Sequence, residues 1–264
     1  MFKQRLIMTF ILIPLVLAGI YYLPNIYFQG IIYLLLGLMI YEWQQFLTLP
    51  KWNQPWLKFT LLALGTSLVV LYWHFFIWVD LIFWLVAIFW IINYPKFQSH
   101  WSGSGMISLN AWILLGVFAA IMIELQDDGY GKNQMVSVLF LVWAADIGAY
   151  LVGRRMGKHK MIPQVSPGKS WEGLMGGIVC AMLIGALEIY ILEPFSLVSW
   201  FLVVLATVVI SVFGDLWMSA LKRHSALKDT GHLIPGHGGI LDRLDSILAA
   251  LPVFYMGMRW ISGN

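Results

Sequence analysis

Charged residues are scarce in this sequence. Asp, Glu, Lys and Arg make up 11% of its 264 residues, whereas soluble domains average about 25%. Cysteine is almost absent as well, and the single Cys180 excludes an intrachain disulfide and a CxxC metal or redox motif. Apolar residues make up 60% of the chain and form runs longer than a soluble core requires. The composition therefore predicts an all-α fold and a polytopic integral membrane protein.

Nine apolar runs approach the roughly 20 residues that a membrane-spanning helix needs. The third and fourth are the least distinct, because His74 and Asp80 interrupt a nearly continuous apolar stretch, and either half could be short or re-entrant. The first run follows two cations, like a signal sequence, but no small-residue cleavage site follows it, so we interpret it as a retained span. The predicted spans are 6–23, 27–47, 57–74, 77–94, 107–125, 134–152, 172–192, 197–219 and 241–261.

The cations predict an orientation for these spans. With the N-terminus in the cytoplasm, 14 of the 16 Lys and Arg residues fall on the cytoplasmic side, and Lys132 and Arg259 fall on the other. Nearly all polar motifs follow residue 133. We therefore expect one membrane domain, 1–264, with an N-terminal transmembrane scaffold (1–133) and a catalytic C-terminal half (134–264) whose loops face the cytoplasm.

Polar residues are densest between Ser219 and Asp245. These 27 residues hold four cations, three carboxylates, three histidines and four glycines. Charge at the edge of a bilayer is costly, so a cluster this dense indicates a working site. Its chemistry suits holding phosphates and a divalent cation against a membrane.

Asp215, Ser219 and Lys222 lie on one helical face, at positions i, i+4 and i+7. A carboxylate just inside the membrane edge, with cations one to two turns further out, suits a metal that bridges to phosphates. A salt bridge between Asp215 and Lys222 along one helix is the plainer alternative, but it does not explain the charges that follow.

Asp242 and Asp245 lie at i and i+3, so both carboxylates project toward one side of a helix. Two close carboxylates repel each other unless one is protonated or a cation lies between them. Hard oxygen ligands favour Mg²⁺, which takes substrate phosphates as further ligands. The predicted metal ligands are therefore Asp215, Asp242 and Asp245, while Arg243 points elsewhere and is a candidate phosphate clamp.

A glycine-rich loop follows Lys228 and Asp229. Gly238 and Gly239 let the backbone approach a ligand closely, and His237 between other glycines can donate to a phosphate or to a leaving oxygen. A flexible loop with an incidental histidine is the alternative.

Asp146 lies inside a predicted span, with Tyr150 and Arg154 on the same helical face. Intramembrane carboxylates are rare and costly, so we favour a polar strip that lines a cavity over a structural pairing with a neighbouring helix. The adjacent cations Arg154 and Arg155 are explained more simply as positive-inside residues.

The segment Ser166–Gly173 begins the seventh predicted span. Its Gly-Lys-Ser sequence is not a P-loop, because Pro163 stands where a glycine is required and no strand precedes it. A helix N-terminus at Ser170 with Lys169 beside it can nevertheless bind an anion. Glu172 fits a contact to the helix dipole and a contact to a metal or ribose equally well.

The stretch from Ser219 to Asp245 resembles the signature of the phosphatidate cytidylyltransferases, also called CDP-diacylglycerol synthases, at every fixed position. The segments 146–150 and 166–173 are similar to upstream family elements, with Ser170 where threonine is usual, which keeps the hydroxyl. The resemblance is specific over 134–250, whereas the N-terminal spans match in hydrophobicity alone. The chain length is similar to that of the bacterial members.

The resemblance implies a step of phospholipid biosynthesis, in which CTP and phosphatidic acid give CDP-diacylglycerol and pyrophosphate. It also implies Mg²⁺, with a second cation left open, a homodimer, the inner (plasma) membrane with the active site facing the cytoplasm, and no nucleic-acid partner. The residues expected in catalysis are Lys222, Arg223, Lys228, Asp229, His237, Asp242, Arg243 and Asp245. Those expected in substrate binding are Asp146, Ser166, Lys169, Ser170, Glu172, Ser219, Gly238 and Gly239.

Two other activities use similar residues. A CTP-dependent lipid kinase would make a phospholipid instead of a nucleotide-diphospho-lipid. An anion transporter also contains intramembrane carboxylates and glycine-broken helices. Its polar groups, however, would lie near the membrane midplane in paired repeats, and here they gather at one face without a repeat, so we rank it last.

Overall fold

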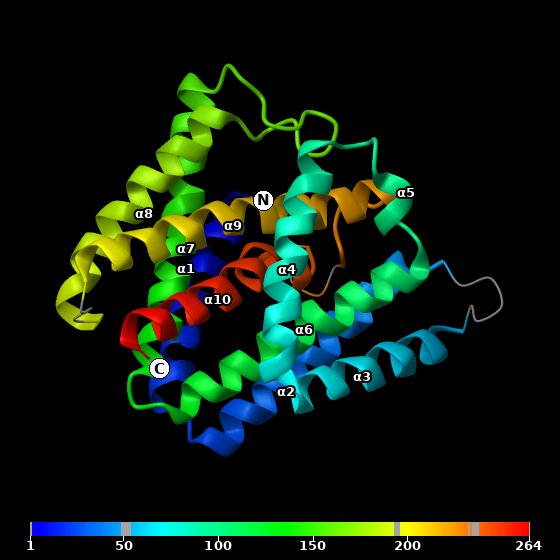
Figure 1. Ribbon diagram of the computed structural model, residues 1–264, viewed down its shortest axis with the longest axis horizontal. Helices are drawn as coiled ribbons and strands as arrows, with labels where there is room; N and C mark the ends of the chain where they lie inside the picture. Colours follow the sequence, from blue (N-terminus) through cyan, green and yellow to red (C-terminus); the bar gives the residue numbers. More distant parts are fainter. Residues whose placement is uncertain (1, 49–53, 193–195, 232, 234–237, 264) are drawn as a thin grey trace.

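The computed structural model describes residues 2–48, 54–192, 196–231, 233 and 238–263, with side chains from residue 11 onward (Figure 1). Within these residues the regular secondary structure is helical, and no strand is present. The helices are α1 (Phe2–Tyr22), α2 (Asn25–Trp43), the 3₁₀ turn η1 (Gln44–Phe46), α3 (Pro55–Leu71), α4 (Trp73–Ile92), the short α5 (Gln98–Trp101), α6 (Ser104–Asp127), α7 (Gly131–Met156), α8 (Trp171–Leu192), α9 (Leu197–His224) and α10 (Leu241–Ser262).

Each predicted span lies mainly on one helix of the described chain, although the third, 57–74, runs past the end of α3 into α4, and the all-α prediction is confirmed. Within the described part of the chain, seven helices can cross a membrane by length and composition: α2 with η1, α4, α6, α7, α8, α9 and α10. α3 and the Ile11–Tyr22 part of α1 are shorter. The break between α3 and α4 falls at Tyr72, so His74, predicted at the end of the third span, lies within α4 together with Asp80. The count of nine spans stays a prediction.

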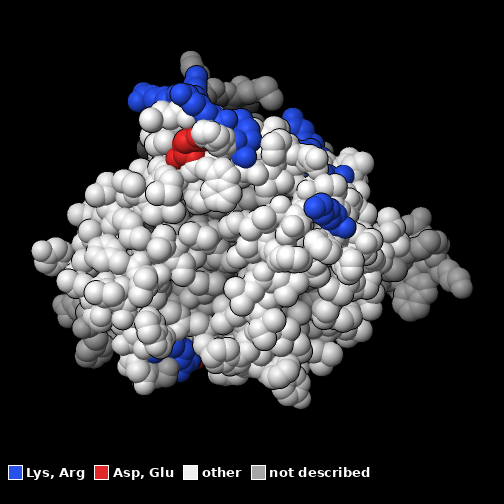
Figure 2. Space-filling model, turned by 45° about the horizontal axis from the view of Figure 1, so that its top comes forward, with Lys and Arg blue, Asp and Glu red and all other residues white. Residues whose placement is uncertain are grey.

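α6 is the central helix, and α2, α3, α4 and α10 pack against it (Figure 1). Its residues 113–121 are buried without interruption. Outer helices instead expose large apolar side chains, as α4 does with Phe75, Trp78, Ile82 and Leu85. Apolar surface of this extent is unfavourable in water. Such a surface is favourable in contact with lipid. Figure 2 shows a broad belt without charged residues that separates the cation-rich end of the molecule from its opposite end.

α7 and α8 form an antiparallel hairpin whose helices touch along small residues (Figure 1). A Cβ added to Gly148 would lie 2.6 Å from the Sγ of Cys180 and 2.6 Å from the carbonyl oxygen of Gly176. Such residues let helix backbones approach closely where lipid offers no hydrophobic driving force. The hairpin fixes the connecting loop, 157–170, which carries Lys169.

Gly148→Ala is therefore expected to destabilise the protein by about 1–3 kcal/mol, because overpacking forces the two helices apart. Thermal unfolding in detergent measures the effect. The matched control is Gly30→Ala in α2, where a new Cβ meets nothing within 4 Å and where alanine should stabilise the helix by about 0.5–1 kcal/mol. Equal unfolding temperatures for the two variants would contradict the close packing of α7 on α8.

α9 and α10 run antiparallel (Figure 1), and together with the connection between them they carry most of the predicted site residues. Gly214 permits their contact, since a Cβ there would lie 2.8 Å from the carbonyl oxygen of Asp245. The C-terminal end of α9 is held by α5, where the Nδ1 of His224 lies 3.0 Å from the Nε2 of Gln98. The crossing at Gly214 brings its neighbour Asp215 close to Asp245, in the second turn of α10.

Candidate functional site

Lys169 and Asp215 form an ion pair between the α7–α8 loop and α9. The Nζ of Lys169 lies 2.6 Å from the Oδ2 of Asp215 and donates to the carbonyl oxygen of Val212 at 3.0 Å. Ser219, one turn along α9, donates to the Oδ1 of Asp215 at 3.3 Å. Asp215 thus forms its ion pair with a residue of another element, Lys169. The simpler alternative drawn from the sequence, a salt bridge with Lys222 along α9, is not the pair that the structure contains.

Lys222 pairs instead with Asp242 on α10. Their Nζ and Oδ1 atoms are 2.7 Å apart, and the side chains are only 12% and 8% exposed. The Oδ2 of Asp242 accepts the backbone N–H of Thr230 at 2.7 Å and that of Gly239 at 3.0 Å. Asp242 therefore holds both ends of the 230–239 connection against the start of α10.

The close approach of this connection to Asp242 requires a glycine at position 238. Its φ is +85°, a conformation that residues with a side chain rarely adopt, and a Cβ there would lie 2.9 Å from the Oδ2 of Asp242. The glycines predicted to approach a ligand thus also bring the backbone onto a site carboxylate. His237, which precedes them, lies outside the described residues.

Asp245 is a buried carboxylate at the crossing of α9 and α10. It is 9% exposed, and its Oδ1 accepts the N–H of Ser246 at 2.7 Å. It interacts electrostatically with Asp215, a like charge, and with nearby lysines. Asp146, exposed on α7, interacts with Asp215 and Lys169. The structure therefore brings together carboxylates from three helices that the sequence placed in separate motifs.

Ser170 and Glu172 have partners within the protein. Ser170 is buried, and its Oγ accepts the N–H of Gly173 at 3.1 Å, which caps the first turn of α8. Glu172 accepts the backbone N–H of His159 at 3.1 Å and lies 2.5 Å from its Nδ1. Both residues fix the loop that carries Lys169, and their contacts to substrate stay predictions.

The other predicted residues surround this centre. Arg223 is exposed, and its Nε donates to the carbonyl oxygen of Val165 at 3.3 Å, which ties α9 to the α7–α8 loop. Ser166 lies partly buried in that loop. Three further predicted residues are exposed, Lys228 and Asp229 in the 225–240 connection and Arg243 just after it.

Glu42, in the last turn of α2, contacts the site although the sequence reasoning does not single it out. It is 1% exposed, and it accepts the N–H groups of Ile240 at 2.9 Å and Leu241 at 2.8 Å. Its signal in the sequence is a lone carboxylate within the apolar run 27–47, a costly position that indicates a role. A helix from the predicted scaffold therefore reaches the catalytic half.

The carboxylates offer the hard oxygen donors that Mg²⁺ prefers. Asp215 and Asp245 approach each other at the helix crossing, whereas Asp242 is engaged by Lys222 and two backbone amides. Among the residues that the structure describes, no three His, Cys, Asp or Glu side chains could hold a metal by themselves. The donor set therefore fits a cation that takes further ligands from water and substrate phosphates, as Mg²⁺ commonly does.

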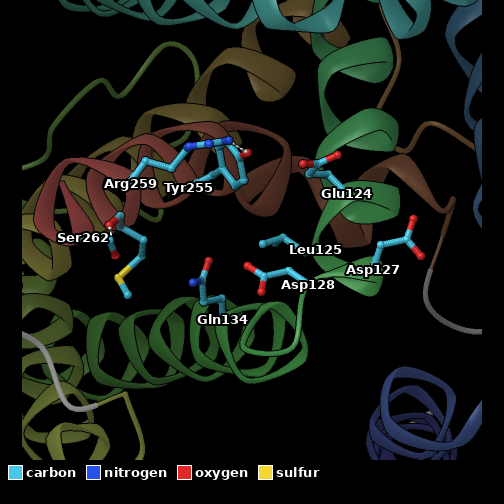
Figure 3. Close-up of a pocket in the computed structure, with 9 residues that line it drawn as sticks. Glu124, Leu125, Asp127, Asp128, Gln134, Tyr255, Arg259 and Ser262 are labelled. Atoms are coloured by element: carbon cyan, nitrogen blue, oxygen red, sulfur yellow. Dashed lines mark hydrogen bonds between the residues drawn. The ribbon is translucent and has the colours of Figure 1, made fainter. Parts of the chain in front are cut away.

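A cavity of about 290 Å³ lies at the other end of α7, between the ends of α6 and α10 (Figure 3). Its lining includes three carboxylates, Glu124, Asp127 and Asp128, and one cation, Arg259, which donates to the hydroxyl of Tyr255 at 2.5 Å. This charge balance disfavours a triphosphate. The cations gather at the opposite end of the molecule, where the site lies (Figure 2).

The sequence model described as "Cytidylyltransferase family" matches residues 3–261, nearly the whole chain. This chain belongs to the cytidylyltransferase family. Similar proteins named phosphatidate cytidylyltransferase occur in Haemophilus influenzae (35% identity over 283 residues, covering 96% of this chain and 97% of the relative), Pseudomonas aeruginosa (34% over 272 residues, 100% and 98%) and Bacillus subtilis (42% over 155 residues, 57% and 56%).

Membership in the cytidylyltransferase family extends beyond the motif-bearing half. The family match and the two longest alignments include α1 to α6, where the sequence offered only hydrophobicity. The bacterial relatives and the apolar helices together identify a multi-pass membrane protein.

Proposed function

We propose that this member of the cytidylyltransferase family transfers the cytidylyl group of CTP to phosphatidic acid, giving CDP-diacylglycerol and pyrophosphate for phospholipid biosynthesis. The observation that carries the proposal is the likeness, over 96–100% of this chain, to proteins named phosphatidate cytidylyltransferase. The geometry supports it, because lysines and carboxylates from three helices and a loop gather where water-borne CTP and a bilayer lipid could meet.

The phosphate of phosphatidic acid is already a nucleophile, so the reaction needs no strong general base. One of its oxygens attacks the α-phosphorus of CTP, and the bond to the bridging oxygen of the departing pyrophosphate breaks. Catalysis then consists mainly of alignment and charge neutralisation, as in phosphoryl transfer generally. Lys169 and Lys222 supply positive charge inside the site and can exchange their aspartate partners for phosphate oxygens.

The surrounding residues have supporting roles in this proposal. Arg223, Lys228 and Arg243 extend the positive charge toward the triphosphate, and His237 stabilises or protonates the leaving pyrophosphate. Asp146, on the outer side of α7, lines the path by which the lipid head enters. The residues that would contact the substrates, or support those that do, are Ser166, Ser170, Glu172, Ser219, Asp229, Gly238 and Gly239.

Mg²⁺ fits the donor set: Asp215 and Asp245 would hold it, and Asp242 would join them when Lys222 leaves it for a phosphate oxygen. When bound, the ion would offset the charge that develops on the phosphates. Measuring the initial rate as a function of Mg²⁺ concentration tests for this cation and for a second one.

The finer architecture belongs to the proposal as well. Nine spans, with α1 and α3 included, place the N-terminus and the cation-rich end in the cytoplasm by the positive-inside rule. The protein would then reside in the inner membrane as a homodimer, with residues 1–133 as a scaffold and 134–264 as the catalytic half of one domain.

Pyrophosphate release tests the proposed function. We expect purified protein in detergent with Mg²⁺ to release pyrophosphate from CTP only when phosphatidic acid is present, and to stop when EDTA is added. Release of CDP without pyrophosphate would indicate a lipid kinase. If a folded sample released neither pyrophosphate nor CDP, an anion transporter would become the better interpretation.

A further inference from the structure

Glu42 joins α2 to the start of α10. Its Oε1 accepts the N–H of Ile240 at 2.9 Å, and its Oε2 accepts the N–H of Leu241 at 2.8 Å. The hydroxyl of Thr230 also donates to Oε2, at 3.2 Å. Both oxygens of one buried carboxylate are thus engaged by a short segment of the C-terminal half, 230–241.

These bonds provide a cap that α10 lacks locally. The first N–H groups of a helix have no partner within the helix, and a side chain at the N-cap position usually accepts one of them. In α10 that position is Ile240, which makes no side-chain cap. The carboxylate of Glu42, 198 residues away, takes this role, and its negative charge is favourable at the positive end of the helix dipole.

Two glycines leave room for this carboxylate. A Cβ added to Gly231 would lie 2.6 Å from the Oε1 of Glu42, and one added to Gly239 would lie 2.6 Å from its Oε2. Gln45, just after Glu42, donates from its Nε2 to the carbonyl oxygen of Thr230. The two ends of the segment, 230–231 and 239–241, therefore both pack against the end of α2.

The same segment sets the position of a pair in the site. Asp242 lies in the turn that Glu42 caps, accepts the N–H groups of Thr230 and Gly239, and pairs with Lys222. A shift of the segment would move Asp242 and, through it, Lys222. We propose that Glu42 is a positioning residue that clamps 230–241, so that Asp242 and Lys222 are held ready for the phosphates of CTP. This inference rests on the proposed function and makes α2 part of the catalytic unit.

Glu42→Gln is the sharpest test, because it preserves shape and replaces one acceptor oxygen with an NH₂ group that faces backbone N–H donors. We expect kcat/KM for CTP to fall about 10- to 100-fold, the usual cost of losing a group that orients the ligands of a site. Glu42→Asp keeps both acceptors on a shorter side chain, and it should recover part of this loss.

Met39→Ala is the matched control. Met39 lies one turn earlier on α2 and is fully buried, so its truncation weakens the packing of the helix without changing an acceptor of the clamp. We expect it to lower the unfolding temperature and leave kcat/KM per folded molecule unchanged. The Met39→Ala control should lose activity only in proportion to the fraction of protein that is unfolded. If Glu42→Gln behaves in the same way, the inference is overturned.

Hydrogen exchange separates the inference from the proposed function, because it requires no activity. In Glu42→Gln, peptides covering 228–242 should exchange faster while the rest of the protein keeps its protection, and Met39→Ala should not show this local change. Wild-type protection of 228–242 in Glu42→Gln overturns the clamp. If the wild-type protein transfers no cytidylyl group, the proposed function fails, and the exchange pattern still decides whether Glu42 holds the segment.

Discussion

Asp245→Ala is expected to lower kcat for cytidylyl transfer by about 10²- to 10³-fold, the usual cost of removing a group that stabilises charge in a transition state. Asp245 is buried at the crossing of α9 and α10, close to Asp215. Among the described residues it forms no salt bridge, whereas Asp215 and Asp242 each pair with a lysine. Its carboxylate is therefore the one least engaged by lysines, and the one most available to a cation that carries the phosphates of CTP.

The dependence of the rate on Mg²⁺ distinguishes a metal ligand from a structural carboxylate. Asp245→Asn preserves the shape of the side chain, and we expect it to raise the Mg²⁺ concentration needed for half-maximal initial rate. The control is Asp128→Asn in the cavity at the other end of α7, which should leave rate and Mg²⁺ dependence as in the wild type. Lost activity with an unchanged Mg²⁺ dependence in the Asp245 variants would count against the metal role.

Lys222→Met is expected to reduce both stability and activity. Lys222 and Asp242 are largely buried, and removing one partner of a buried pair leaves an uncompensated charge at a cost of about 3–5 kcal/mol. The phosphates of CTP also lose a cation, so we expect kcat/KM to fall about 10²-fold or more. Thermal unfolding and initial rates, measured on the same preparation, separate the two effects.

The double variant Lys222→Met with Asp242→Asn tests whether the uncompensated charge of Asp242 causes the loss of stability. Removing both charges relieves the uncompensated carboxylate, so stability should return toward that of the wild type while activity stays low. Lys158→Met, at an exposed cation of the α7–α8 loop, should change neither property. A fully stable Lys222→Met variant, or a double variant with restored activity, would contradict this account of the pair.

The helices could be predicted from the sequence because lipid-facing and buried helix surfaces are both apolar, so long apolar runs mark each one. The same uniformity hides where a helix breaks. His74 and Asp80 suggested an interruption in this region, with one span ending at 74 and the next beginning at 77, yet the break falls at Tyr72. Asp80 is fully buried within α4, the helix that corresponds to the fourth predicted span.

The site could be predicted as a set of residues but not as a set of pairs. Spacing along one helix suggested Asp215 with Lys222, and the structure joins Asp215 to Lys169 and Lys222 to Asp242. Such partners come from other elements, and periodicity within a helix cannot reveal them. Glu42 was missed for the same reason, since its partners lie about 190 to 200 residues away and are mostly backbone N–H groups, which carry no sequence signal.

The central claim is that cytidylyl transfer occurs in this protein, and the fate of labelled CTP tests it most directly. Purified wild-type protein is incubated with phosphatidic acid, Mg²⁺ and CTP labelled on either the α- or the γ-phosphate, and the lipid phase is extracted and counted. We predict that the α-label enters the lipid, that the γ-label stays in water as pyrophosphate, and that EDTA abolishes the transfer. Entry of the γ-label alone, or of neither label from folded protein, would contradict the account.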